Sequence, residues 1–165
     1  MINSVSELLN YKEGAQSNIL LRIMAGSVFF WEGLIKFVFQ NQGVGRFTKI
    51  GFPIPEFTST FVALLEIIGG LLLIFGLFTR VICVPFIIEM LVATLSTKIA
   101  MFLGTSPLAL PPVPPVTGFW AVLHEVRSEY AQLICCLYLL INGPGRMSLD
   151  AIFFRKKSLN IESTG

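Results

Sequence analysis

The sequence predicts an all-α protein of the integral membrane class, a four-helix bundle with short interfacial helices at both termini. Of its 165 residues, 54% are hydrophobic and only 13% are charged, whereas soluble domains carry about 25% charged residues. The mean hydropathy is +0.76. Several apolar stretches approach the roughly 20 residues that a helix needs to cross a bilayer. One such bundle accounts for the whole length, so we expect a single membrane domain over residues 1–165.

Each apolar stretch ends at a turn signal. A loop rich in glycine and proline follows the first stretch, and Thr79-Arg80 makes an abrupt turn after the second. A proline-rich segment, 103–118, follows the third stretch, and the Gly143-Pro144-Gly145 sequence ends the fourth. We therefore expect the membrane spans at 18–39, 57–78, 81–101 and 120–141.

The two ends of the chain have the pattern of helices that lie on a membrane surface. The sequence SVSE, Ser4 to Glu7, fits a capping box and begins a short apolar face. Near the other end, Ser148 is expected to cap a short helix that precedes the basic residues 155–157. Basic residues are more frequent on the side of both termini, so the positive-inside rule predicts cytoplasmic termini. The polar first 17 residues predict no cleavable signal peptide.

Each predicted span carries a glutamate near its middle. With a helical rise of 1.5 Å per residue, Glu32 lies about 5 Å to the outer side of the centre of the first span. Glu66, Glu89 and Glu129 lie about 3 Å from the centres of the other three. A carboxylate in hydrocarbon costs several kcal/mol. Four of them at one depth therefore predict that the acids face protein rather than lipid.

Cations and small residues accompany these acids. Lys36 follows Glu32 by one helical turn, the favourable order for an ion pair on one face. Arg22 lies on the same stripe of the first span as Lys36. Glu66 shares its face with two residues that let a neighbouring helix approach closely, Gly69 and Gly70.

Several interpretations of these charges are open. They form either a network that fixes which helix faces which, or a polar cavity for a proton, a quinone head group or a small polar substrate. A metal site is the third alternative, but His124 has no Glu-x-x-His partner, so we expect no metal ligands among these residues. Nucleophilic triads, phosphate-binding loops and nucleic-acid patches are absent from the sequence.

The cysteines, Cys83, Cys135 and Cys136, fall in predicted spans and form no Cys-x-x-Cys pair. We expect them to be small apolar packing residues. A thiolate metal site that combines Cys83 with one of the other two is the alternative. No ligand set for haem, flavin or an iron–sulfur cluster is recognisable in the sequence.

Four segments, in this order and spacing, resemble the DoxX family of small four-helix membrane proteins: LLRIMAGSVFFWEGLIKF, ALLEIIGGLLLIFGLFTR, EYAQLICCLYLL and GPGRMSLD. The resemblance covers about Asn18 to Ala151. The polar positions that recur in the family map onto Arg22, Lys36, Glu66, Thr79, Arg80 and Glu129. Many members carry histidine where this chain has Glu32, so an imidazole function at that position is not available here.

The resemblance implies a bacterial inner-membrane protein that works beside other subunits or as a homo-oligomer, in quinone-coupled or other oxidoreductase systems. The leading hypothesis is therefore a membrane subunit of a redox or maturation system, and an accessory subunit if the system is an enzyme. Its polar pocket would contain Glu66 and Glu129 foremost and would bind a quinone or its protons, while Arg80 and Thr79 fix the cytoplasmic turn or contact a partner. A small transporter or channel, and a non-catalytic anchor or assembly factor for a soluble partner, are the alternatives.

Overall fold

The computed structural model describes residues 15–153, and every regular element in that range is a helix. The helices are α2 (Asn18–Val38), α3 (Val44–Ile50), α4 (Pro55–Phe75), α5 (Thr79–Phe102), α6 (Gly118–Glu125) and α7 (Arg127–Asn142). Residues 149–153 are also helical. The amphipathic segment expected around Ser4–Glu7 and the basic residues 155–157 lie outside the described range.

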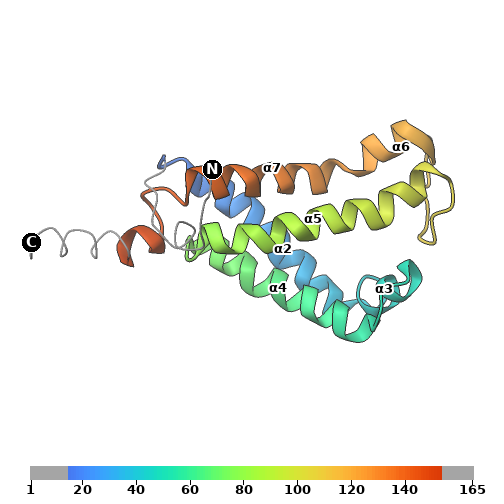
Figure 1. Ribbon diagram of the computed structural model, residues 1–165, viewed down its shortest axis with the longest axis horizontal. Coiled ribbons are helices and arrows are strands. Elements are labelled where there is room, and N and C mark those ends of the chain that lie inside the picture. Colours follow the sequence, from blue (N-terminus) through green and yellow to red (C-terminus); the bar gives the residue numbers. More distant parts are fainter. Residues whose placement is uncertain (1–14, 154–165) are drawn as a thin grey trace, which may run out of the picture.

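The long helices run back and forth between two ends of the molecule (Figure 1). One end contains the turn between α4 and α5 around Gly76, and we call it the Gly76 end. The opposite end contains α3, which connects α2 to α4, and we call it the α3 end. Helix α2 packs along α4, and α5 packs along α7, so the molecule consists of two helix pairs. The two pairs approach each other at the Gly76 end and diverge toward the α3 end (Figure 1).

Three of the helices, α2, α4 and α5, are long and apolar enough to cross a membrane. They correspond to the first three predicted spans, with ends that differ by at most three residues. The chain turns between α4 and α5 through two residues with positive φ, Gly76 at 69° and Phe78 at 51°. Glycine adopts this left-handed conformation without steric strain. Gly76 therefore forms the C-cap of α4, whose last residue is Phe75. Pro85 is accommodated within α5.

The fourth predicted span differs from a single continuous helix. It is divided at Val126 into α6 and α7. Helical hydrogen bonds continue on both sides of the break, from the Val126 amide to the Val122 carbonyl and from the Tyr130 amide to the Val126 carbonyl. Charged and polar residues surround the break, namely His124, Glu125, Arg127 and Glu129. A continuous membrane-spanning helix at this point would place those side chains in hydrocarbon. Neither α6 nor α7 is among the three candidate spans.

Glycines determine how closely α2 and α4 approach. A Cβ atom added to Gly26 would lie 2.7 Å from the carbonyl oxygen of Gly70, and one added to Gly70 would lie 2.6 Å from that of Gly26. Further along, a Cβ atom on Gly33 would lie 2.7 Å from the Ala63 carbonyl oxygen. The two backbones are therefore in direct contact over about two helical turns, the packing that small residues permit between membrane helices.

The apolar core lies where the two helix pairs meet. Phe29 of α2 stacks on Phe86 of α5 with ring centroids 3.7 Å apart. Cys83 and Cys136 are completely buried in this core, and Cys135 is almost completely buried. All three cysteines have free thiols. Their surroundings are those of the small apolar packing residues that the sequence predicts.

The α2–α4 contact gives the first testable prediction. Gly70→Leu should lower the free energy of unfolding by about 1–3 kcal/mol, because the new side chain overlaps the Gly26 backbone and forces the helices apart. Thr60→Leu is the matched control, since Thr60 is exposed on the same helix. Denaturation of both variants in detergent measures the difference, and equal stabilities would contradict the close contact.

Candidate functional site

A buried ion pair joins α2 to α4. The Nζ atom of Lys36 lies 2.5 Å from Oε2 of Glu66 and donates a hydrogen bond to it. Lys36 stands near the last turn of α2, so its long side chain reaches back toward the middle of α4, where Glu66 is buried. This pair depends on the glycine contact, because the Cβ of Glu66 itself lies against Gly33.

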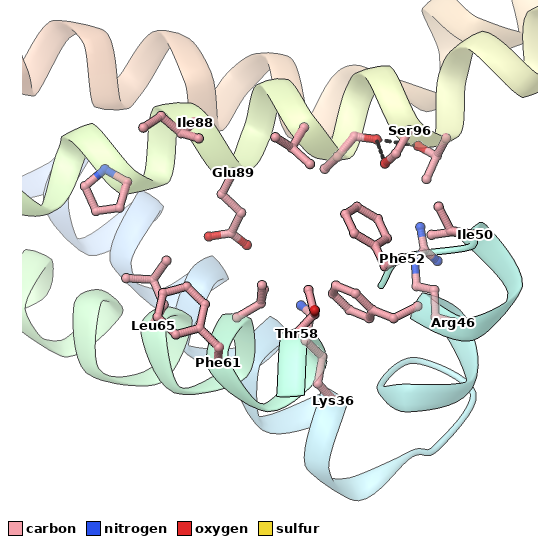
Figure 2. Close-up of a pocket in the computed structure, with 16 residues that line it drawn as sticks. Lys36, Arg46, Ile50, Phe52, Thr58, Phe61, Leu65, Ile88, Glu89 and Ser96 are labelled. Carbon is pink, nitrogen blue, oxygen red and sulfur yellow. Dashed lines mark hydrogen bonds between the residues drawn. The ribbon is translucent and has the colours of Figure 1, made fainter. Parts of the chain in front are cut away.

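Glu89 of α5 lies beside this pair. The carboxylates of Glu66 and Glu89 are close enough to interact directly, and Lys36 is near both of them. The Glu89 side chain points into the space between α4 and α5 (Figure 2). Its Oε2 atom is buried and has no hydrogen-bond partner among residues 15–153. Lys36, Glu66 and Glu89 therefore form a cluster of three ionisable side chains from three helices, which we call the mid-span cluster.

A cavity of about 360 Å³ adjoins the mid-span cluster. Helices α4 and α5 form its long sides, and α3 with the loop that follows lies at one end (Figure 2). Lys36 and Glu89 are part of its wall. The other lining residues are mostly apolar, with a few hydroxyl groups and one further cation: Arg46, Phe47, Ile50, Phe52, Thr58, Phe61, Val62, Leu65, Pro85, Ile88, Val92, Ala93, Ser96 and Thr97. The cavity therefore suits a ligand with a large apolar part and a small polar part.

Glu32 takes a different place from the one that the sequence predicts. Its side chain is exposed on the outer surface of α2 rather than directed into the cluster. Lys36 contacts only the backbone carbonyl of Glu32, at 3.4 Å, and gives its short hydrogen bond to Glu66. The expected i,i+4 ion pair between Glu32 and Lys36 is replaced by a pair between helices.

Glu129 also lies apart from the mid-span cluster. It forms an ion pair with Lys98 of α5 at 3.0 Å. Lys98 follows Glu89 by nine residues, which corresponds to about 13 Å along the helix toward the α3 end. The prediction that all four glutamates share one depth is therefore wrong. The break at Val126 explains the error, because α7 begins only two residues before Glu129.

Arg22 also lies apart from the mid-span cluster, at the Gly76 end. Its side chain is 1% exposed, and Nη2 donates a hydrogen bond to the Met147 carbonyl at 2.5 Å. Gly76 leaves the space that the guanidinium group occupies, since a Cβ atom there would overlap Nη1. Arg22 thus joins α2 to the segment after α7 and takes no part in the cavity.

Asp150 is a structural residue that the sequence analysis missed. Its two carboxylate oxygens accept hydrogen bonds from the backbone amides of Phe78 and Thr79, at 2.7 Å and 3.0 Å. It therefore caps the N-terminus of α5 from 71 positions further along the chain. Burial raises the pKa of the Asp150 carboxyl, while the two amides and the nearby charge of Arg22 act in the lowering direction. The sequence signal was present, since Asp150 ends the GPGRMSLD segment.

The other residues that the sequence predicts to be structural also have partners within the protein. Thr79 is completely buried, and Arg80 donates a hydrogen bond from Nε to the Leu140 carbonyl at 2.8 Å. Gly69 lies against the Phe86 ring, where a Cβ atom would be 2.6 Å from Cζ. Ser148 caps residues 149–153 as predicted, because its Oγ accepts a hydrogen bond from the Ala151 amide at 3.1 Å.

Metal ligands do not gather within the described part of the chain. No group of three or more histidine, cysteine, aspartate or glutamate side chains there is arranged to hold a metal ion. His124 lies on α6, exposed, and its Nε2 atom is 3.2 Å from Nη2 of Arg127. The mid-span cluster itself offers two carboxyl groups and one ammonium group, which can exchange protons and donate or accept hydrogen bonds.

Comparison with known proteins shows the class to which this helical membrane protein belongs. The DoxX family matches residues 17–99, about half of the chain. The chain is 38% identical over 148 residues to "Uncharacterized membrane protein Rv3486" of Mycobacterium tuberculosis, which covers 86% of this chain and 84% of that protein. It is 29% identical over 147 residues to "Putative oxidoreductase CatD" of Bacillus subtilis, covering 88% and 93%. The chain belongs to the DoxX family and is a multi-pass membrane protein. No solved structure matches it.

The mid-span ion pair gives the second prediction. Lys36→Met should lower the free energy of unfolding by about 3–5 kcal/mol, because it leaves the Glu66 carboxylate buried without its cation. The double variant Lys36→Met/Glu66→Leu should recover most of that loss, since it removes both charges. Denaturation of the single and double variants in the same detergent measures the difference. A double variant no more stable than Lys36→Met would contradict the pairing.

The Asp150 cap gives the third prediction. Asp150→Ala should destabilise the protein by about 0.5–2 kcal/mol, the usual cost of removing a helix N-cap. Amide hydrogen exchange should accelerate at Phe78 and Thr79 first, because these two amides lose their acceptors. Asp150→Asn, which keeps one side-chain oxygen as an acceptor, should lie between the wild type and Asp150→Ala. Unchanged exchange at both amides in Asp150→Ala would be incompatible with the cap.

Proposed function

We propose that this protein is an accessory membrane subunit of an oxidoreductase system and that its cavity binds the head group of a quinone. In this proposal the ammonium group of Lys36 donates a hydrogen bond to a quinone carbonyl oxygen. Glu89 exchanges a proton with the same head group. Reduction of a quinone to a quinol takes up two electrons and two protons. A partner subunit supplies the electrons, Glu89 passes on one proton, and the ammonium group of Lys36, which is hydrogen-bonded to the carbonyl oxygen, passes on the other.

The observation that carries this proposal is the free oxygen of Glu89. Its Oε2 atom is buried beside an apolar cavity without a hydrogen-bond partner in the described range. An ionised carboxylate in that situation costs several kcal/mol unless it is paired. Glu89 therefore needs a proton, its own or one shared with Glu66, or a hydrogen bond from a ligand to Oε2. A carboxyl group that accepts a hydrogen bond from a bound quinol, or takes up a proton, is suited to proton exchange.

The composition of the cavity supports a quinone rather than a strongly polar ligand. Its volume of about 360 Å³ falls at the lower end of the range of about 300–1,000 Å³ that small-molecule sites occupy. The walls are largely apolar, with Lys36 and Glu89 at one place on them. A flat ring with two carbonyl oxygens matches this combination, since such a ring needs few polar contacts and much apolar surface.

The name of one relative supports a redox function. One relative, similar over 88% of this chain, is called a putative oxidoreductase. Glu129, which the sequence analysis placed in the same pocket, is given a structural function here because it is paired with Lys98. The proposal therefore rests on Lys36, Glu66 and Glu89.

We also propose that the protein lies in the bacterial plasma membrane with both termini in the cytoplasm, so that the Gly76 end is cytoplasmic. Arg80 and Arg146 lie at this end. Arg46 and Lys49 of α3 lie at the other, while Lys98 is neutralised by Glu129. With the basic residues 155–157 added on the side of the C-terminus, the positive-inside rule favours this orientation.

The fourth prediction tests the quinone site with protein in lipid nanodiscs. Lys36→Met/Glu66→Leu should bind a quinone at least tenfold more weakly, because it loses the hydrogen-bond donor to the carbonyl oxygen. Glu89→Gln should still bind the quinone within about threefold, since the amide keeps the shape and a polar group. In infrared difference spectra, quinone binding should perturb a carboxylic acid C=O band in the wild type, and Glu89→Gln should lack that band.

Glu56→Gln is the matched control, because Glu56 is an exposed acid in the first turn of α4, outside the cavity. It should show wild-type binding and the wild-type infrared band. Wild-type protein that binds no quinone at saturating concentration in the nanodisc would contradict the proposed function. An infrared band that persists in Glu89→Gln would exclude Glu89 as the proton-exchanging group.

A further inference from the structure

The two most exposed residues of the cavity wall are part of the outer surface of the protein. Phe61 of α4 is 57% exposed and Ile88 of α5 is 56% exposed, although both line the cavity. Both stand well inside helices that are candidate membrane spans. The exposed face of such a helix is in contact with lipid, so the cavity wall and the lipid-facing surface meet at these two side chains.

The arrangement of the helices explains why the wall is incomplete here. Helix α4 packs mainly along α2, and α5 packs mainly along α7. Near the Gly76 end, Gly69 of α4 lets the Phe86 ring of α5 approach closely. From there the two helices diverge toward the α3 end (Figure 1), and the side chains of Phe61 and Ile88 remain exposed.

The end of the cavity at α3 is covered instead. Phe47 and Ile50 of α3, together with Phe52 from the loop that follows, line the cavity there, with Arg46 beside them (Figure 2). Phe47 and Phe52 also contact each other, with ring centroids 5.3 Å apart. A ligand that entered from water would have to pass this aromatic and aliphatic layer, whereas a ligand dissolved in lipid meets Phe61 and Ile88, with Val92 of α5 as a further exposed residue of the wall.

We propose that the cavity opens sideways into the bilayer between α4 and α5, and that Phe61 and Ile88 form the portal. This inference rests on the proposed function, and it specifies the ligand further. The cavity of about 360 Å³ holds a ring-sized head group beside Lys36 and Glu89, and the apolar tail of the ligand leaves through the portal into the lipid. The site therefore selects quinones that carry a long hydrocarbon tail and that arrive through the membrane.

Tryptophan substitutions at the portal test this inference. The variant Phe61→Trp/Ile88→Trp should narrow the portal, while the matched control Leu64→Trp/Leu91→Trp adds the same groups at exposed positions outside the cavity wall on the same two helices. Each variant is reconstituted in lipid vesicles and its binding of a long-tailed quinone and of the corresponding tail-less quinone is measured. We expect at least tenfold weaker binding of the long-tailed quinone in the portal variant only, and a change of less than threefold for the tail-less one.

The outcomes separate the portal from the quinone site itself. If the portal variant binds the long-tailed quinone as tightly as the control variant does, the portal is wrong and the quinone site stands. If both quinones lose affinity equally, the tryptophans fill the head-group region, which also overturns the portal. If the wild type binds neither quinone, the proposed function fails and the portal with it.

A widened portal gives a second test if the tryptophan variant does not fold. Phe61→Ala/Ile88→Ala should release the long-tailed quinone at least threefold faster than the wild type, because less side-chain volume stands between the cavity and the lipid. Leu64→Ala/Leu91→Ala is the control and should release it at the wild-type rate. An unchanged release rate in a folded Phe61→Ala/Ile88→Ala variant overturns the portal.

Discussion

The close packing of α2 against α4 is the constraint on which the rest of the structure depends. Backbone contact at Gly26, Gly33 and Gly70 brings the end of α2 over the middle of α4, so that Lys36 reaches Glu66. Because α2 covers this face of α4, α4 packs against α5 over only a small surface. Helix α5 in turn packs along α7. The space between α4 and α5 is therefore a direct result of how the helices are paired, and the cavity with Glu89 in its wall occupies that space.

Charges in the membrane-spanning region are separated into levels, each with its own counter-charge. Arg22 and Asp150 are close at the Gly76 end, Lys36 pairs with Glu66 near the middle, and Lys98 pairs with Glu129 toward the α3 end. Buried ion pairs add little net stability compared with apolar residues, but losing one partner is costly. Such pairs fix which helices are neighbours and how far each is shifted along its axis. Against this background, the unsatisfied Oε2 atom of Glu89 stands out as a group available to a ligand.

The sequence was sufficient for what depends on local pattern. Apolar length predicted α2, α4 and α5, Ser148 was recognised as a helix cap, and the small residues near Glu66 predicted a close helix contact there. It was insufficient for what depends on how one helix is shifted against another. Counting residues from the span centres assumes straight helices at equal height, and the break at Val126 violates that assumption for Glu129. The rotation of α2, which exposes Glu32 and turns Lys36 inward, is set by Gly26 and Gly33 together with the helix that they contact.

The Asp150 cap has a consequence for how the chain matures in the cell. Helix α5 is synthesised before residue 150. The first amides of α5 therefore lack their acceptor until the chain beyond α7 has been made. Throughout that interval the inserted hairpin of α4 and α5 lacks the contact that secures its turn. Completion of the last residues before the C-terminal tail therefore acts as a closing step of biogenesis. A chain that ends before Asp150 leaves the first two amides of this turn without their acceptor.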